Sequence, residues 1–144
     1  MSSKEIRGEM TISWLAVAVA TAVGMAIAQA WYGWVFLGVW RELTGVTEED
    51  SKRAGKRPLA VLVASILVTA VVLAAGCSLA SGFFASDPLW LDLAVGFVTS
   101  LGFSLTTLVQ HNAFEQKPAR LTVINSAYQL TLFLGMALAI GLLQ

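Results

Sequence analysis

The residues best suited to acid–base, nucleophilic or metal chemistry are few and isolated in this chain. His111 is the only histidine and Cys77 is the only cysteine. A zinc or iron site needs several His, Cys or carboxylate ligands at matching spacing, and this sequence does not group them. It also has no glycine-rich phosphate loop, nucleophile elbow or pair of acids. We therefore predict no catalytic residue, no cofactor and no metal site.

Uncharged polar residues, in contrast, follow a helical pattern. Ser100, Ser104, Thr107 and His111 are spaced i, i+4, i+7, i+11, which is one face of a helix. A second set, Asn125, Tyr128 and Gln129, is spaced i, i+3, i+4 on the last predicted span. The residues that we expect at similar depth near one membrane face are Gln29, Thr107, Asn125, Tyr128 and Gln129, with His111 at the rim. They form either interhelical hydrogen bonds, each worth about 0.6 kcal/mol, or a polar pocket for a small ligand or a lipid headgroup.

The elements that must position these residues are membrane helices. The 144 residues are 57% apolar and 12% charged, with a mean hydropathy of +0.75. Nine basic and nine acidic residues leave no net charge, which argues against a nucleic-acid partner. Four stretches without charged residues exceed the roughly 20 residues that span a bilayer. We predict one all-α domain, an integral membrane four-helix bundle with spans at about 11–32, 58–80, 88–111 and 121–143.

The first apolar stretch is too long for one perpendicular span. Residues 10–40 would extend about 46 Å as a helix. We expect a break near Gly33, followed by an aromatic segment, 33–40, along the membrane interface. Thr47 has the sequence of a helix cap, Pro58 suits the start of the second span, and Asp87 is placed to cap the third.

Charge distribution predicts the orientation. Two basic residues, Lys4 and Arg7, lie on the side of the chain ends, and seven lie in the first and third loops. These seven are Arg41, Lys52, Arg53, Lys56, Arg57, Lys117 and Arg120. The positive-inside rule places loops 41–57 and 112–120 in the cytoplasm and both termini outside. We expect the first apolar stretch to be retained, because it continues past the cleavage-like sequence at Ala30.

Small residues indicate where helices meet. Ala16, Ala20, Gly24 and Ala28 form a stripe at i+4 steps, and a second series of alanines follows beside it. Because lipid provides no hydrophobic drive between helices, such stripes allow the close approach on which packing depends. We expect the first span to be central in the bundle, and we expect a second copy of the chain as a partner.

Ionisable residues are absent from the middle of every predicted span. Asp92 is the nearest, and we expect it at the outer interface. Proton-coupled transporters and ion pumps use intramembrane acids or bases. The sequence therefore argues against these functions.

Two motifs resemble a known family. Gly24, Trp31, Tyr32, Gly38 and Trp40, followed by the segment 45–49, are similar to the opening motif of the bacterial membrane-protein family known as domain of unknown function 1761. The segments 114–115 and 121–128 are similar to its second motif. The resemblance implies four transmembrane helices in a bacterial inner membrane and no established activity.

Three functional hypotheses follow. The leading hypothesis is a non-enzymatic protein of the bacterial inner membrane that acts through packing or binds a ligand or a lipid. Its expected partners are membrane lipid and a second copy of the chain. An alternative is a small-solute carrier or channel formed by an oligomer and lined by Ser100, Ser104 and Asn125. Another is a membrane enzyme acting on lipid, with Tyr128 or His111 as its acid–base group.

Overall fold

Helices make up almost all of the described chain. The structure, a computed structural model, describes residues 10–144, and no strand occurs among them. Four helical segments are long and apolar enough to cross a membrane, which confirms the predicted all-α, four-helix architecture. These segments are Trp14–Val35, Arg57–Phe84, Leu89–Phe114 and Ala119–Leu143. Lys4 and Arg7, which entered the charge count, lie outside the described residues.

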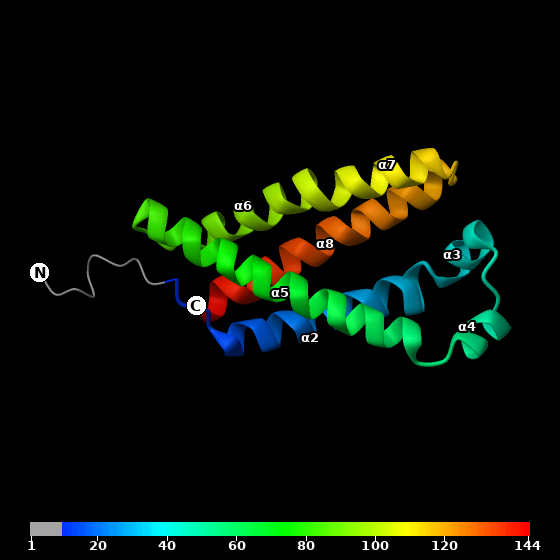
Figure 1. The fold of residues 1–144 in the computed structure, drawn as a ribbon, viewed down its shortest axis with the longest axis horizontal. Coiled ribbons are helices and arrows are strands. Elements are labelled where there is room, and N and C mark those ends of the chain that lie inside the picture. Colours follow the sequence, from blue (N-terminus) through cyan, green and yellow to red (C-terminus); the bar gives the residue numbers. More distant parts are fainter. Residues whose placement is uncertain (1–9) are drawn as a thin grey trace, which may run out of the picture.

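The four segments run in alternating directions along one elongated bundle (Figure 1). The start of α2 (Trp14–Ala30) and the end of α8 (Ala119–Leu143) lie together at what we call the termini end. The connections after the first and third segments lie at the opposite end, which we call the loop end. Loops 41–57 and 112–120, with all the described basic residues, therefore share the loop end.

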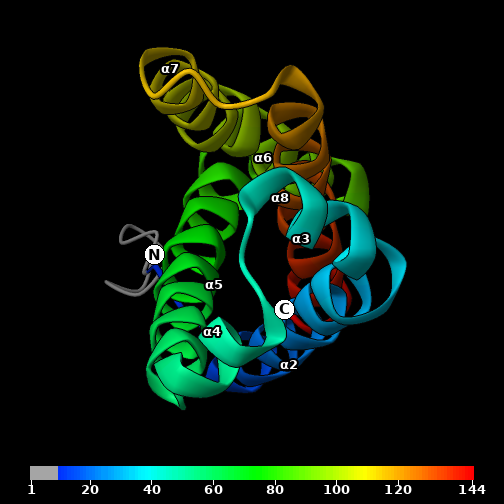
Figure 2. The same cartoon turned by 90° about the vertical axis from the view of Figure 1, so that its right-hand side faces the viewer.

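Two helices contact all the other membrane segments. α8 and α5 (Arg57–Phe84) each pack against all three other segments, whereas α2 packs mainly against α5 and α8. Figure 2 shows α2 and α6 (Leu89–Thr99) on opposite sides of the bundle. The prediction that the first span is central is therefore wrong.

The small-residue stripe of α2 forms its buried face, as predicted. Ala16, Ala20, Gly24 and Ala28 are all buried. A Cβ added to Gly24 would lie 2.7 Å from Cγ2 of Ile66 on α5, so the two backbones approach more closely than a side chain allows. The second series faces outward at Ala18, Ala22 and Ala26.

α6 packs just as closely on α8. A Cβ added to Gly96 would lie 2.7 Å from Cβ of Ala137 and 3.1 Å from the carbonyl oxygen of Phe133. Neither atom belongs to a flexible side chain that can move aside. Glycine is therefore the residue that fits this contact.

Two spans contain a π-helical turn. In η1 (Trp31–Val35), the Phe36 N–H donates to the Trp31 carbonyl at 2.9 Å. A kink at Phe36 then leads to α3 (Leu37–Thr44), so the break comes three residues later than expected from Gly33. In the third span, η2 (Ser100–Leu105) separates α6 from α7 (Thr106–Phe114).

Two of the three helix starts that the sequence predicts agree with the structure. α4 (Glu48–Ala54) begins with a capping box between Thr47 and Asp50, as the sequence predicts. α5 has Pro58 in its first turn, where the missing N–H leaves no bond unmade. α6 follows Pro88 without a side-chain cap, so the prediction that Asp87 caps it is wrong.

Replacing Gly96 by alanine tests the α6–α8 contact. We expect Gly96→Ala to lower the free energy of unfolding by about 1–3 kcal/mol, because the added methyl group overpacks the contact. Gly82→Ala is the control, since nothing lies within 4 Å of its Cβ; it should be neutral or stabilising by up to about 1 kcal/mol. Reversible unfolding in mixed detergent micelles measures both, and equal stabilities would contradict the close contact.

Acidification tests the capping box of α4. The N–H and hydroxyl of Thr47 donate to the Asp50 carboxylate at 2.9 and 2.8 Å and lower the pKa of Asp50. The cap is therefore fully present above the ordinary aspartate pKa of about 3.9 and is lost as the pH falls through the lowered value. An NMR titration of the Asp50 carboxyl carbon measures this. Thr47→Val should return the pKa towards the ordinary value, and an ordinary pKa in the wild type would contradict the cap.

Candidate functional site

Two hydrogen bonds join η1 to α8 at the loop end. The Tyr32 hydroxyl donates to Oδ1 of Asn125 at 2.7 Å. The indole N–H of Trp31 donates to the carbonyl oxygen of Ile124 at 3.2 Å. Consecutive residues of η1 therefore contact consecutive residues of α8, and each polar tip has a partner within the membrane segment.

Aromatic contacts extend this cluster. The rings of Tyr32 and Tyr128 lie 4.8 Å apart at 66°, and those of Tyr32 and Trp40 lie 6.2 Å apart at 68°. Both pairs have the edge-to-face geometry that the charge distribution of aromatic rings favours. We call Trp31, Tyr32, Asn125 and Tyr128 the aromatic–amide cluster.

Gln29 lies beside the cluster because a glycine makes room for it. A Cβ added to Gly33 would collide with the side-chain amide of Gln29, one turn earlier in the helix. The amide thus rests against the bare backbone of η1. The glycine in this π turn serves close packing, although the chain breaks only at Phe36.

Three recesses lie along α5, and two of them adjoin the cluster. The α4 recess, about 520 Å³, is lined by Gln29, Tyr32 and Trp40 and by residues of α4 and α5. The α5–α8 recess, about 340 Å³, is lined by Tyr128 and Gln129 together with α5. The third, the α5–α6 recess, has a volume of about 290 Å³ and apolar walls from α5, α6, η2 and α8.

Shared lining residues connect these recesses. Pro58 and Leu62 line both the α4 recess and the α5–α8 recess. Thr69 lines both the α5–α8 recess and the α5–α6 recess. The three recesses therefore form one series that follows α5 from the loop end towards the middle of the bundle.

The structure does not bring Thr107 and His111 to the cluster. Both are exposed on α7, and the Thr107 hydroxyl donates to the Phe103 carbonyl of its own span at 2.6 Å. The buried residues of this span are Ser100 and Asn112, which are 12 positions apart. In an uninterrupted α-helix, the residue on the same face as Ser100 would be His111, 11 positions later, but His111 is exposed. The π turn η2 adds one residue to the helix, so the face shifts by one position.

The residues of the first motif have different roles. Gly24 is buried between α5 and α8, and Trp31 and Tyr32 belong to the cluster. Trp40 lines the α4 recess. Gly38 is exposed, with nothing within 4 Å of an added Cβ, so no contact in the described chain explains it.

Sequence reasoning missed two polar positions. Asn112 is buried and donates to the Thr122 hydroxyl at 3.0 Å, which joins α7 to α8. Asp92, which we expected at the outer interface, is 1% exposed and packs between α5, α6 and α8. A buried α6 face through Asp92, Gly96 and Ser100 at i+4 steps is the signal that identifies it.

Apart from Asp50 in the α4 recess, the groups that the loop-end site presents are uncharged. Amides, phenols and indoles supply hydrogen bonds, and aliphatic walls supply apolar contact. Among residues 10–144, no group of three or more His, Cys, Asp or Glu side chains is placed to hold a metal ion.

Removing the Tyr32 hydroxyl tests the bond to Asn125. We expect Tyr32→Phe to destabilise the bundle by about 0.6 kcal/mol, and by no more than about 1.7, the range measured for interhelical hydrogen bonds in membranes. Tyr128→Phe is the matched control, because its hydroxyl has no hydrogen bond to the described residues and its ring contact remains. A double-mutant cycle with Asn125→Ala, measured by unfolding in detergent, should give the same coupling; zero coupling would contradict the bond.

Comparisons with known proteins place the chain in a family. A search of curated proteins and a search of solved structures gave no match. The family model described as "Protein of unknown function (DUF1761)" matches residues 15–141. This match includes both motifs and confirms the resemblance noted in the sequence. Since it covers nearly the whole chain, the protein belongs to the DUF1761 family.

Proposed function

We propose that this protein binds an anionic membrane lipid in the series of recesses along α5. The proposal includes an orientation in which the chain spans a bacterial inner membrane four times. Both termini lie outside, and loops 41–57 and 112–120 lie in the cytoplasm. The bound lipid then belongs to the cytoplasmic leaflet, since the recesses begin at the loop end.

The observation that carries the proposal is the change from polar to apolar lining along α5. The α4 and α5–α8 recesses contain the amides of Gln29 and Gln129 and the phenols of Tyr32 and Tyr128. The α5–α6 recess lies deeper and is lined mainly by aliphatic and phenyl groups. A lipid has the same order of groups, a polar head followed by an acyl chain.

The deep recess suits an acyl chain because its few hydroxyls are already engaged. The Thr69 hydroxyl donates to the Ser65 carbonyl at 2.8 Å, and the Thr99 hydroxyl donates to the Val95 carbonyl at 2.6 Å. The remaining lining is aliphatic or phenyl. An acyl chain can cover this surface and leave no polar group unpaired.

The shallow recesses offer groups for a headgroup. Gln129 makes no side-chain hydrogen bond to the described residues and is half-buried in the α5–α8 recess. Its amide supplies both donors and an acceptor. Gln29 presents the same group in the adjoining α4 recess.

Charge favours an anionic headgroup. Lys56 and Arg57 are exposed and immediately precede Pro58, which lines both shallow recesses. Each basic residue near an anionic membrane surface contributes about 1 kcal/mol. Asp50 also lines the α4 recess, so we place the anionic group on the α5–α8 side of Pro58.

No specific observation favours the other two hypotheses. A carrier or channel lined by Ser100, Ser104 and Asn125 requires these side chains to face a common path. Ser100 is fully buried, and Asn125 is held by Tyr32. An enzyme with His111 as its acid–base group requires a charged partner, and His111 is exposed with no ion pair in the described chain.

Lipid retention tests whether Lys56 and Arg57 favour an anionic headgroup. Native mass spectrometry of protein released from nanodiscs with equal phosphatidylglycerol and phosphatidylcholine should show preferential retention of phosphatidylglycerol. Lys56→Gln with Arg57→Gln should reduce this preference roughly thirtyfold, since two charges contribute about 2 kcal/mol. Lys117→Gln with Arg120→Gln is the control, because neither residue lines a described recess.

Filling the deep recess tests the acyl-chain position. Val72 lines the α5–α6 recess, whereas Val98 is equally exposed and lines none of the three. Val72→Trp should reduce retention of both lipids, and Val98→Trp should leave it unchanged. The proposal fails if the wild type shows no preference for the anionic lipid, or if both tryptophan variants bind lipid alike.

A further inference from the structure

Among the Asp, Glu, Lys and Arg side chains of residues 10–144, Asp92 is the only one that is buried. It lies in the first turn of α6, near the termini end, and its exposed fraction is 1%. α6 begins at the end of the bundle opposite the loop end (Figure 1). Val95, three residues after Asp92 on α6, lines the α5–α6 recess, but Asp92 itself lines none of the three recesses of the proposed lipid site.

The groups around Asp92 include no cation. The titratable groups that act on Asp92 are the Cys77 thiol of α5 and the carboxyl group of Asp87. α8 contributes Gly141, where an added Cβ would lie 2.7 Å from Oδ2 of Asp92. α2 has no titratable side chain, and those of α8, Arg120 and Tyr128, lie in the half of the helix nearer the loop end. The described basic residues all lie at the loop end.

Neither carboxyl oxygen of Asp92 accepts a backbone or charged hydrogen bond. Both atoms are buried and lack a partner in the described chain. A helix N-terminus favours a negative charge, but the first N–H groups of α6 donate to neither oxygen. An isolated carboxylate in such a place costs several kcal/mol or more, and one bound proton removes that cost. On the α8 side, the bare backbone of Gly141 lies so close that an added Cβ would be 2.7 Å from Oδ2 of Asp92.

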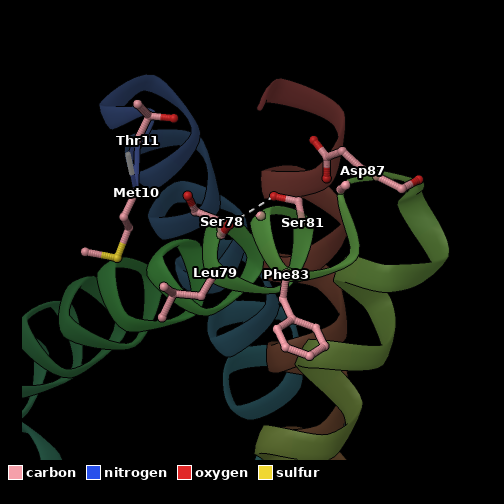
Figure 3. A pocket seen from close by; sticks show the side chains of 10 residues that line it. Met10, Thr11, Ser78, Leu79, Ser81, Phe83 and Asp87 are labelled. Atoms are coloured by element: carbon pink, nitrogen blue, oxygen red, sulfur yellow. Dashed lines mark hydrogen bonds between the residues drawn. The ribbon is translucent and has the colours of Figure 1, made fainter. Parts of the chain in front are cut away.

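A recess that several hydroxyl groups line lies near this position. The recess at the termini end, about 670 Å³, is lined by the hydroxyls of Thr11, Ser78 and Ser81 and by Asp87 (Figure 3). Ser78 follows Cys77 on α5, so the recess begins one residue from the contact of Asp92. Gln144 lines a neighbouring recess and donates to the Ala74 carbonyl at 3.3 Å, one turn before Cys77.

We propose that Asp92 is a proton-binding site at the termini end of the bundle. A proton delivered by water adds to one carboxylate oxygen and gives a neutral carboxylic acid, and no other bond forms or breaks. In this state α6 packs on α5 and α8 without a buried charge.

The site changes which activities suit this fold. Intramembrane acids are the groups through which membrane proteins couple work to protons. The sequence argued against such coupling because it placed Asp92 at the interface. The burial of Asp92 in the first turn of α6 gives the fold one acid enclosed by helices, the type of residue on which a proton-linked step depends.

Carboxyl-carbon NMR tests the proposal directly. The chain has three aspartates, Asp50, Asp87 and Asp92, so ¹³C-labelled aspartate gives three side-chain carboxyl signals. The full chain in lipid bilayers is measured by solid-state NMR at pH 7. We expect two signals at the carboxylate position and one shifted upfield to the carboxylic-acid position.

Variants assign the signals even if the central one does not fold. Asp92→Asn, which keeps the size of the side chain, should remove the upfield signal and leave the other two unchanged. If this variant does not fold, Asp50→Asn and Asp87→Asn assign the third signal by elimination. Three carboxylate signals at pH 7, or an upfield signal that belongs to Asp50 or Asp87, would overturn the proposal.

Discussion

The close approach of α8 to its neighbours is the contact on which the rest of the structure depends. Lipid gives helices no hydrophobic reason to associate, so the bundle relies on contacts that only small residues permit. Gly24 and Gly96 bring α2 and α6 against α8 from two sides, and Gly141 does the same beside Asp92. These close approaches fix the positions of the helices along one another, and so determine which polar groups lie side by side. Tyr32 then meets Asn125 at one end of the bundle, and Asp92 meets Cys77 at the other.

The two ends of the bundle treat polar groups in opposite ways. At the loop end, the helices leave recesses along α5, and the aromatic–amide cluster satisfies its own polar tips while adjoining free amides. At the termini end, an acid is enclosed between helices with no cation near it, beside a recess that several hydroxyl groups line. The loop end thus presents uncharged polar groups to open recesses, whereas the termini end buries a charged residue type.

Sequence reasoning succeeded where a single helix carries its own signal. The charge-free stretches predicted four spans, the stripe from Ala16 to Ala28 predicted a buried face, and Thr47 predicted a capped helix. It failed where the answer depends on a neighbour. The i+4 face through Asp92, Gly96 and Ser100 marks the packed side of α6, but the close approach of Gly141 that helps to enclose Asp92 is a property of α8. Within the site, Asn125 and Tyr128 were found by spacing, but Thr107 and His111 were misplaced because η2 interrupts the α-helical register assumed for that face.

The π turns have a consequence for comparing relatives. An extra residue in an ordinary helix rotates everything after it by about 100°, which would ruin a packed face. A π turn absorbs the extra residue within itself, so both sides keep their direction. A relative that lacks one residue within 31–35 or 100–105 can therefore wind an uninterrupted α-helix and present the same surfaces. A one-residue gap inside a membrane helix normally indicates a misalignment, but it is expected in an alignment at these two places. Residues after such a gap correspond to each other with their numbers shifted by one.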